Sequence, residues 1–143
     1  MIKRYRTVAA LALLALAGPA LGSARPGGQP EGIWINPHND VAVRTGPCGD
    51  KLCGWIVWAN AEAQSDARDG GVSKLLGTEL LENYGHVRAD SWTGTVFVPD
   101  MGRRFSSRID LISPTELQIK GCILGGLICR SQVWHRIERL PGA

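Results

Sequence analysis

The sequence predicts a small antiparallel all-β domain of seven or eight strands, with one short helix or lid loop. Apolar and polar residues alternate along most of the chain, turn-forming residues separate the alternating runs, and the cysteines occur in pairs around glycine-containing turns. The alternation is clearest in residues 103–111, where Phe105, Ile109 and Leu111 share one side and charged or serine side chains share the other. This pattern is typical of a strand with one buried face.

Similar alternating runs predict the remaining strands, and clusters of Gly, Pro, Asn and Asp between them predict turns. One stretch departs from this period. Residues 60–71 are polar and alanine-containing, and the leucine pairs within 74–84 predict a short helix or lid-like loop over one end of the sheet. The predicted strands are 32–35, 41–45, 52–58, 91–98, 103–111, 116–122 and 128–137.

Residues 1–24 have the order of a signal peptide. Three basic residues lie within the first six positions, residues 8–17 are uniformly apolar, and small residues follow Pro19. The apolar run is half of the about 20 residues needed to cross a bilayer, so we expect cleavage rather than anchoring. Cleavage after Gly22 and cleavage after Ala24 both fit. We therefore expect a periplasmic or secreted protein with no membrane span after signal removal.

The remaining chain is expected to form a flexible N-terminus, residues 25–31, followed by one β-domain, residues 32–140. Removing three of the 16 basic residues with the signal leaves 13 basic and 13 acidic residues. A neutral domain without runs of like charge lacks the electrostatic footprint of a nucleic-acid-binding protein. We therefore expect no nucleic-acid partner.

The four cysteines fall into two local pairs, Cys48 with Cys53 and Cys122 with Cys129. An even number of cysteines in an exported chain predicts disulfides, and we expect local pairing among the three possible connectivities. The alternative is a four-cysteine zinc site. Its support is weaker, because four and six residues separate the paired cysteines, whereas zinc sites commonly have two to four. We expect no metal.

Four long segments resemble the exported bacterial family called domain of unknown function 2147, and the similarity extends over residues 32–137. The family has no established biochemical activity. The resemblance implies a lipocalin-like β-barrel, whereas the alternation alone also fits a sandwich. The segments are Gly32-Ile-Trp34, 47–58 (PCGDKLCGWIVW), 92–107 (WTGTVFVPDMGRRFSS) and 121–136 (GCILGGLICRSQVWHR).

Lipocalin-like barrels begin with a Gly-x-Trp motif and place an arginine of the last strand over that tryptophan as a cation–π contact. Gly32 and Trp34 match the motif, and either Arg130 or Arg136 matches the arginine. The resemblance therefore assigns these residues to structural closure of the barrel rather than to ligand contact.

Five tryptophans lie in the predicted domain and are candidates for core packing or for a binding site. Trp55 and Trp58 are three residues apart in a strand, so they are expected on opposite faces, with Trp58 on the face of Leu52 and Ile56. We expect the likeliest pocket walls to be Trp58, Trp92 and Trp134.

No group of residues indicates catalysis or a cofactor. The three histidines are far apart in sequence, and no serine lies in a nucleophile elbow. The leading hypothesis is an exported protein that binds a small apolar molecule inside its barrel. The alternative is a non-catalytic envelope module, structural or protein-binding, with a packed barrel that acts through residues 60–71 or an exposed rim. An enzyme site around His86 and Asp90 is less well supported, and no protein partner is indicated.

Overall fold

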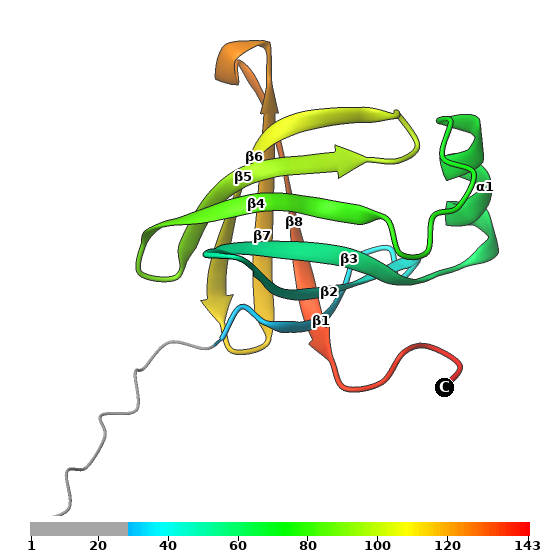
Figure 1. Cartoon of the computed structure of the whole chain (residues 1–143), viewed down its shortest axis with the longest axis horizontal. Helices are drawn as coiled ribbons and strands as arrows, with labels where there is room; N and C mark the ends of the chain where they lie inside the picture. The colour runs from blue at the N-terminus through cyan, green and yellow to red at the C-terminus, as the bar shows by residue number, and fades with distance from the viewer. Residues whose placement is uncertain (1–28) are drawn as a thin grey trace, which may run out of the picture.

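The computed structural model describes residues 29–143 (Figure 1). The predicted signal peptide, both cleavage positions and residues 25–28 lie outside the described residues. Within these residues, eight strands and one α-helix follow one another, with a single 3₁₀ turn, η1, before the last strand. The elements are β1 (Gly32–Ile35), β2 (Val41–Cys48), β3 (Lys51–Ala59), α1 (Ala61–Asp69), β4 (Glu79–Arg88), β5 (Ser91–Val98), β6 (Arg103–Ser113), β7 (Glu116–Ile123), η1 (Leu124–Gly126) and β8 (Ile128–Ile137).

The strands form a closed antiparallel barrel in sequence order, which confirms the all-β prediction and the barrel expected from the family resemblance. Each strand pairs with its neighbour in the chain, and β1 closes the barrel by pairing with β8 through Trp34 opposite Arg136. Closure removes the free edges that an open sheet of this size would expose.

The helix and the fourth strand differ from the prediction. The helix is α1, upstream of residues 74–84, and Glu79–Arg88 is a strand. Asn60 caps the helix, because its side-chain oxygen accepts a hydrogen bond of 2.8 Å from the backbone N–H of Ala63. The consecutive Leu80 and Leu81 are both buried, and the register of β4 against β3 shifts on either side of Gly54. These irregularities hide the strand's period of two.

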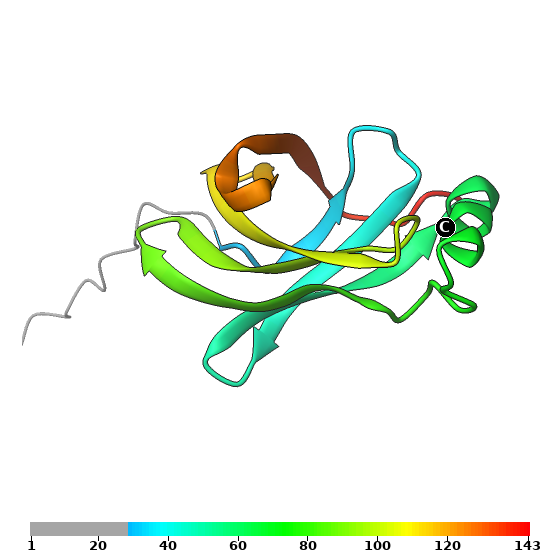
Figure 2. The ribbon, with the colours of Figure 1, turned by 90° about the horizontal axis from the view of Figure 1, so that it is seen from above.

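Helix α1 covers one end of the barrel, as Figures 1 and 2 both show. Ala67 is buried in the barrel core, Ala63 packs against it from the same helix, and Leu75 follows from the segment after the helix. The predicted lid over one end of the sheet is therefore present, although its helix precedes the leucines.

The barrel interior is filled with side chains. Strand alternation turns every second residue inward, and the largest of these residues have almost no exposed surface. No space remains in the middle of the barrel for a drug-sized ligand, since such ligands occupy about 300 Å³ or more. The largest fully buried side chains of this core are Trp34, Val43, Ile56, Leu81, Tyr84, Ile109 and Leu117.

A bulge in β3 changes the face on which Trp58 lies. Ile56 pairs with Val43 and Trp58 pairs with Ala42, so Val57 is an extra residue in the register. Val43 belongs to the interior cluster and Ala42 does not. Trp58 therefore lies on the outer side, and the prediction that it shares a face with Leu52 and Ile56 was wrong.

Candidate functional site

The end of the barrel opposite α1 is closed by Arg136 and the segment before β1. The Arg136 guanidinium lies 4.2 Å from the centre of the Trp34 ring. It also donates hydrogen bonds to the backbone carbonyls of Pro114, Glu31 and Gln29. A side chain at Gly32 would overlap the guanidinium, so the close approach requires glycine there. This contact has the arrangement that the family resemblance implies.

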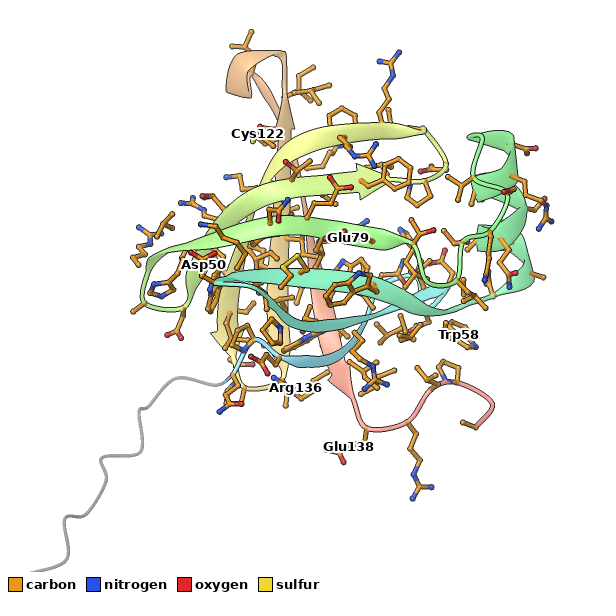
Figure 3. All side chains as sticks on the ribbon, viewed as in Figure 1. Asp50, Trp58, Glu79, Cys122, Arg136 and Glu138 are labelled. Atoms are coloured by element: carbon orange, nitrogen blue, oxygen red, sulfur yellow. A yellow bond between two sulfur atoms is a disulfide. The ribbon has the colours of Figure 1, made fainter. Side chains whose placement is uncertain are left out.

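Of the two candidate arginines, the structure places Arg136 over Trp34. Arg130 is exposed and pairs with Gly121 nearer the tip of the β7–β8 hairpin. Figure 3 shows Arg136 close to the point where the chain enters β1. The indole N–H of Trp34 lies 3.1 Å from the Pro30 carbonyl and 3.0 Å from the Thr45 hydroxyl, so Trp34 is held as a fixed part of the closure.

A pocket of about 150 Å³ lies at this closed end, and we call it the N-terminal pocket. The segment before β1, the β2–β3 turn and the ends of β4 and β5 surround it. The rings of His86 and Trp92 form one wall, with centres 5.5 Å apart and planes tilted by 59°. The side chains that line it include Pro30, Lys51, Leu52, Tyr84, His86 and Trp92.

Tyr84 lines the N-terminal pocket and is a feature that the sequence did not reveal. Its side chain has no exposed surface. Its hydroxyl and that of Ser107 have no hydrogen-bond partner within the described residues. Burial raises the pKa of Tyr84 well above its ordinary value, the nearby Ser107 hydroxyl opposes this shift in part, and the Glu82 carboxylate adds to it. Tyr84 is therefore a neutral hydrogen-bond donor at physiological pH.

A second, open depression of about 580 Å³ lies on the outer side of β5, β6 and β7, and we call it the outer depression. Most of its lining side chains alternate along β5 and β6 with inward residues such as Trp92 and Ile109. Its lining includes Thr93, Thr95, Ser106, Arg108, Lys120 and the two cysteines 122 and 129.

A family model described as "uncharacterized protein conserved in bacteria (DUF2147)" matches residues 32–136, which span all eight strands but the last residue of β8. The chain belongs to the DUF2147 family. None of the curated proteins compared with it is similar enough to count as a relative.

A solved structure supports the fold of this DUF2147 chain. It is similar to protein HP1028 of the human pathogen Helicobacter pylori, whose structure is described as belonging to the lipocalin family. The two share 14% sequence identity with a TM-score of 0.60, over 77% of this chain and 84% of that one. At this identity the similarity shows a common fold.

Both disulfides of the DUF2147 domain join the locally paired cysteines. Cys48 bonds to Cys53 across the β2–β3 turn, beside the N-terminal pocket, and Cys122 bonds to Cys129 across the β7–β8 hairpin, beside the outer depression. All four thiols are thereby used, so no zinc site forms from them. Within residues 29–143, no helix is both long and apolar enough to cross a bilayer.

The structure separates the three tryptophans that were predicted to form pocket walls. Trp92 lines the N-terminal pocket. Trp134 is buried in the core, and its indole N–H donates to the Gln132 side chain over 3.0 Å. Trp58 lies on the outer side and lines neither the pocket nor the depression. Core packing therefore accounts for Trp134, and Trp92 is the one of the three that remains accessible from a pocket.

The histidines also lie apart in the DUF2147 barrel. His38 is in the β1–β2 turn, His86 lines the N-terminal pocket, and His135 lies 4.0 Å from the Glu116 carboxylate on the outside. The described part of the chain contains no group of three or more His, Cys, Asp or Glu residues placed to hold a metal ion.

Proposed function

We propose that this DUF2147 protein is an exported binding protein that holds a small molecule against Trp92 in the N-terminal pocket. The observation that carries the proposal is the packing of the barrel. Its middle is filled, and the pocket at the closed end is where interior aromatic rings remain within reach of a ligand. An indole wall with polar groups at the rim is the usual composition of a small-molecule site.

Export is supported by the N-terminal sequence and by the disulfides. The order of basic, apolar and small residues in 1–24 fits a cleaved signal peptide. Two disulfides are stable in the periplasm or outside the cell and are rare in the reducing cytoplasm. Both observations support the proposal that the mature protein works in the periplasm or in the medium.

The pocket restricts the chemistry of the ligand. A volume of about 150 Å³ is smaller than the usual range for drug-sized molecules, so a long acyl chain would not be enclosed. Trp92, Leu52 and Pro30 supply apolar surface, while His86 and Lys51 supply polar groups. The best match is a compact molecule with one aromatic or apolar part and one polar end, rather than the wholly apolar ligand expected from the sequence.

The proposal is tested by ligand capture and by the fluorescence of defined variants. Protein purified from the periplasm of its own host is examined by native mass spectrometry for a bound molecule, which is then titrated back into stripped protein. We expect Trp92→Ala to weaken binding by about tenfold, because one aromatic contact is lost. Binding next to Trp92 should change the tryptophan emission of the wild-type protein, and Trp92→Phe is expected to remove this change.

Trp55→Phe is the matched control, since Trp55 pairs with the exposed Arg44 on the outer face and lines neither hollow. This variant is expected to retain both affinity and the emission change. The proposal fails if no small molecule co-purifies and no member of a panel of lipids and small aromatic compounds changes the emission of the wild-type protein.

The filled interior also favours a second candidate, a packed envelope module that acts through its surface. A lipocalin-like barrel without a central cavity needs no ligand to complete its core. The experiment above separates the two functions, because a stable, folded protein that captures no small molecule is the result expected of the module.

A further inference from the structure

The tip of the β7–β8 hairpin exposes apolar side chains that the barrel does not cover. Leu127 is 85% exposed, Ile128 45% and Ile123 39%. Among the side chains that the structure describes, seven large apolar ones are exposed, and three of these lie in positions 123–128. Figure 1 shows this orange tip projecting beyond strands β4 to β6. Clustered apolar exposure at a projecting point is typical of a contact surface.

The tip is held in a fixed shape. Cys122 and Cys129 are directly opposite in the register of β7 and β8, and their disulfide lies at the base of the tip. Ile123 and Ile128 form the next pair beyond it. Figure 3 shows Cys122 at this end of the molecule. Because the turn is stapled, little conformational entropy is lost when the apolar side chains are buried against a partner.

The charge around the tip is positive. Lys120 and Arg130 are exposed on the two strands, and no acidic residue occurs in positions 117–133. Lys120 and Arg130 lie on opposite faces of the hairpin, because Lys120 pairs with Ser131 and Arg130 with Gly121. The Arg108 guanidinium lies on the Lys120 face, where both residues line the outer depression. Arg108 is paired with Asp110 over 3.3 Å, whereas Lys120 forms no ion pair within the described residues.

We propose that the β7–β8 tip docks this protein end-on on an anionic lipid bilayer. Leu127, Ile128 and Ile123 enter the boundary between headgroups and acyl chains. Lys120 on the outer face of the hairpin and Arg130 on its inner face flank the tip, so both basic side chains reach the phosphate groups of the lipids around the inserted tip. An apolar tip beside basic side chains is the composition that binds the interface of such a membrane without crossing it.

This surface is distinct from the proposed ligand site, since no residue of the tip and neither Lys120 nor Arg130 lines the N-terminal pocket. The docking proposal therefore stands or falls separately from small-molecule binding. A variant at Trp92 is expected to bind vesicles normally, and a variant at Leu127 is expected to bind the small molecule normally.

Co-sedimentation with vesicles tests the docking surface. The protein is incubated with vesicles of phosphatidylglycerol and phosphatidylethanolamine in equal parts, and with vesicles of phosphatidylcholine alone. We expect binding to the first and much weaker binding to the second. Leu127→Asp combined with Ile128→Asp should reduce the partition coefficient by about tenfold or more, because apolar area no longer enters the bilayer.

The charge contribution is tested by Lys120→Glu combined with Arg130→Glu, which should abolish the preference for anionic vesicles. In the wild-type protein, added salt should reduce the same preference. Met101→Asp and Val87→Asp are the controls, because both residues are exposed apolar side chains elsewhere on the barrel. They should bind as the wild type does. All variants carry the same N-terminus, so a contribution from residues 1–28 is equal throughout.

Circular dichroism and thermal unfolding check that each variant is folded. We expect all of them to fold, because the substituted side chains are exposed. The proposal is overturned if the wild type binds no vesicle, if the Leu127 and Ile128 double variant binds as the wild type does, or if the Met101 and Val87 controls lose binding equally.

Discussion

At the scale of single residues, the row of Gly94, Ser107 and Gly121 shows how the barrel makes room for Tyr84. These three residues are paired across β5, β6 and β7 and face the interior. The Tyr84 ring lies directly over Gly94, where a Cβ would be 2.7 Å from both the ring and the Glu82 carbonyl oxygen. A Cβ built at Gly121 would lie 3.8 Å from the nearest side-chain atom, the Cγ1 of Val96. The two strand glycines therefore have different reasons to be present.

We predict that Gly94→Ala lowers the free energy of unfolding by about 2 kcal/mol, because the added methyl group forces the Tyr84 ring or the β4 backbone to move. Gly121→Ala is the matched control, and its methyl group meets only ordinary van der Waals contacts. The Gly121→Ala variant should have a free energy of unfolding, measured by urea denaturation, within about 0.5 kcal/mol of the wild type. Equal losses in both variants would contradict this account of Gly94.

The residue-level predictions succeeded where alternation is regular and failed where it is interrupted. The prediction that Ile109 and Leu111 share a buried face of one strand was confirmed, because β6 continues without a bulge through its pairing with β5, from Arg103 to Asp110. Trp58 was placed on the wrong face, because the extra residue Val57 reverses the alternation. Tyr84 was missed, because its burial depends on a register that also shifts in β4.

At the scale of elements, the two disulfides close similar loops but hold different surroundings. Cys53 is buried, and its sulfur accepts a hydrogen bond from the backbone N–H of Asn83 on the neighbouring strand, so its bridge is part of the barrel wall. Cys129 is exposed, and its bridge to Cys122 holds a tip that lies beyond Gly121, the last residue of β7 that pairs with β6. The first bridge should therefore matter for global stability and the second for local order.

We predict that Cys48→Ser with Cys53→Ser lowers the free energy of unfolding by about 2 kcal/mol, as loop-closure entropy indicates for short loops. Cys122→Ser with Cys129→Ser should change the urea midpoint much less. Its effect is expected in hydrogen exchange, as lost amide protection in residues 121–130, and in weaker binding to anionic vesicles. If tip protection survives removal of the second bridge, the tip does not depend on the staple.

The sequence predicted elements from their period and from turn residues, and it misplaced the helix as well as missing β4. The misplaced helix has a physical cause. Residues 61–69 bury only Ala67, so α1 has no apolar stripe that marks a helix in sequence. Its best local signal is Asn60, whose side chain caps the first turn. The helix is stable where it is because its alanines cover the end of a barrel that other segments build.

At the scale of the whole molecule, closure of the barrel determines the chemistry of Tyr84. Pairing of β1 with β8 completes the wall around the interior and leaves the phenol without exposed surface. Its pKa is raised above the ordinary value of about 10, mainly by burial. The folded protein therefore keeps the phenolic proton at alkaline pH, whereas the unfolded chain releases it.

Because the folded state then binds more protons than the unfolded state, stability should fall as pH rises above about 10. The slope contributed by Tyr84 is about 1.4 kcal/mol per pH unit. Tyr84→Phe should remove this component. At neutral pH the same variant should be as stable as the wild type or slightly more so, since the hydroxyl makes no hydrogen bond in the described structure.

Urea unfolding is carried out at a series of pH values from neutral to alkaline. The effect is the difference in the free energy of unfolding between the wild type and Tyr84→Phe at each pH. The difference isolates the contribution of Tyr84, because every other group is common to the two proteins. If the free energies of unfolding of the two proteins depend on pH in the same way, the phenol is accessible to solvent in the folded state. That result would contradict the burial of Tyr84.

The amino-acid sequence by itself determined the class of the domain, the positions of seven strands, the local pairing of the cysteines and the family resemblance. These properties depend on alternation, turn residues and short sequence separations, which are local. Only the tertiary structure decided that Arg136 rather than Arg130 covers Trp34, that Trp92 alone of its three candidates lines a pocket, and that the barrel is filled. Those outcomes depend on bulges and on the meeting of β1 with β8, because side chains more than 100 residues apart become neighbours only when the barrel closes.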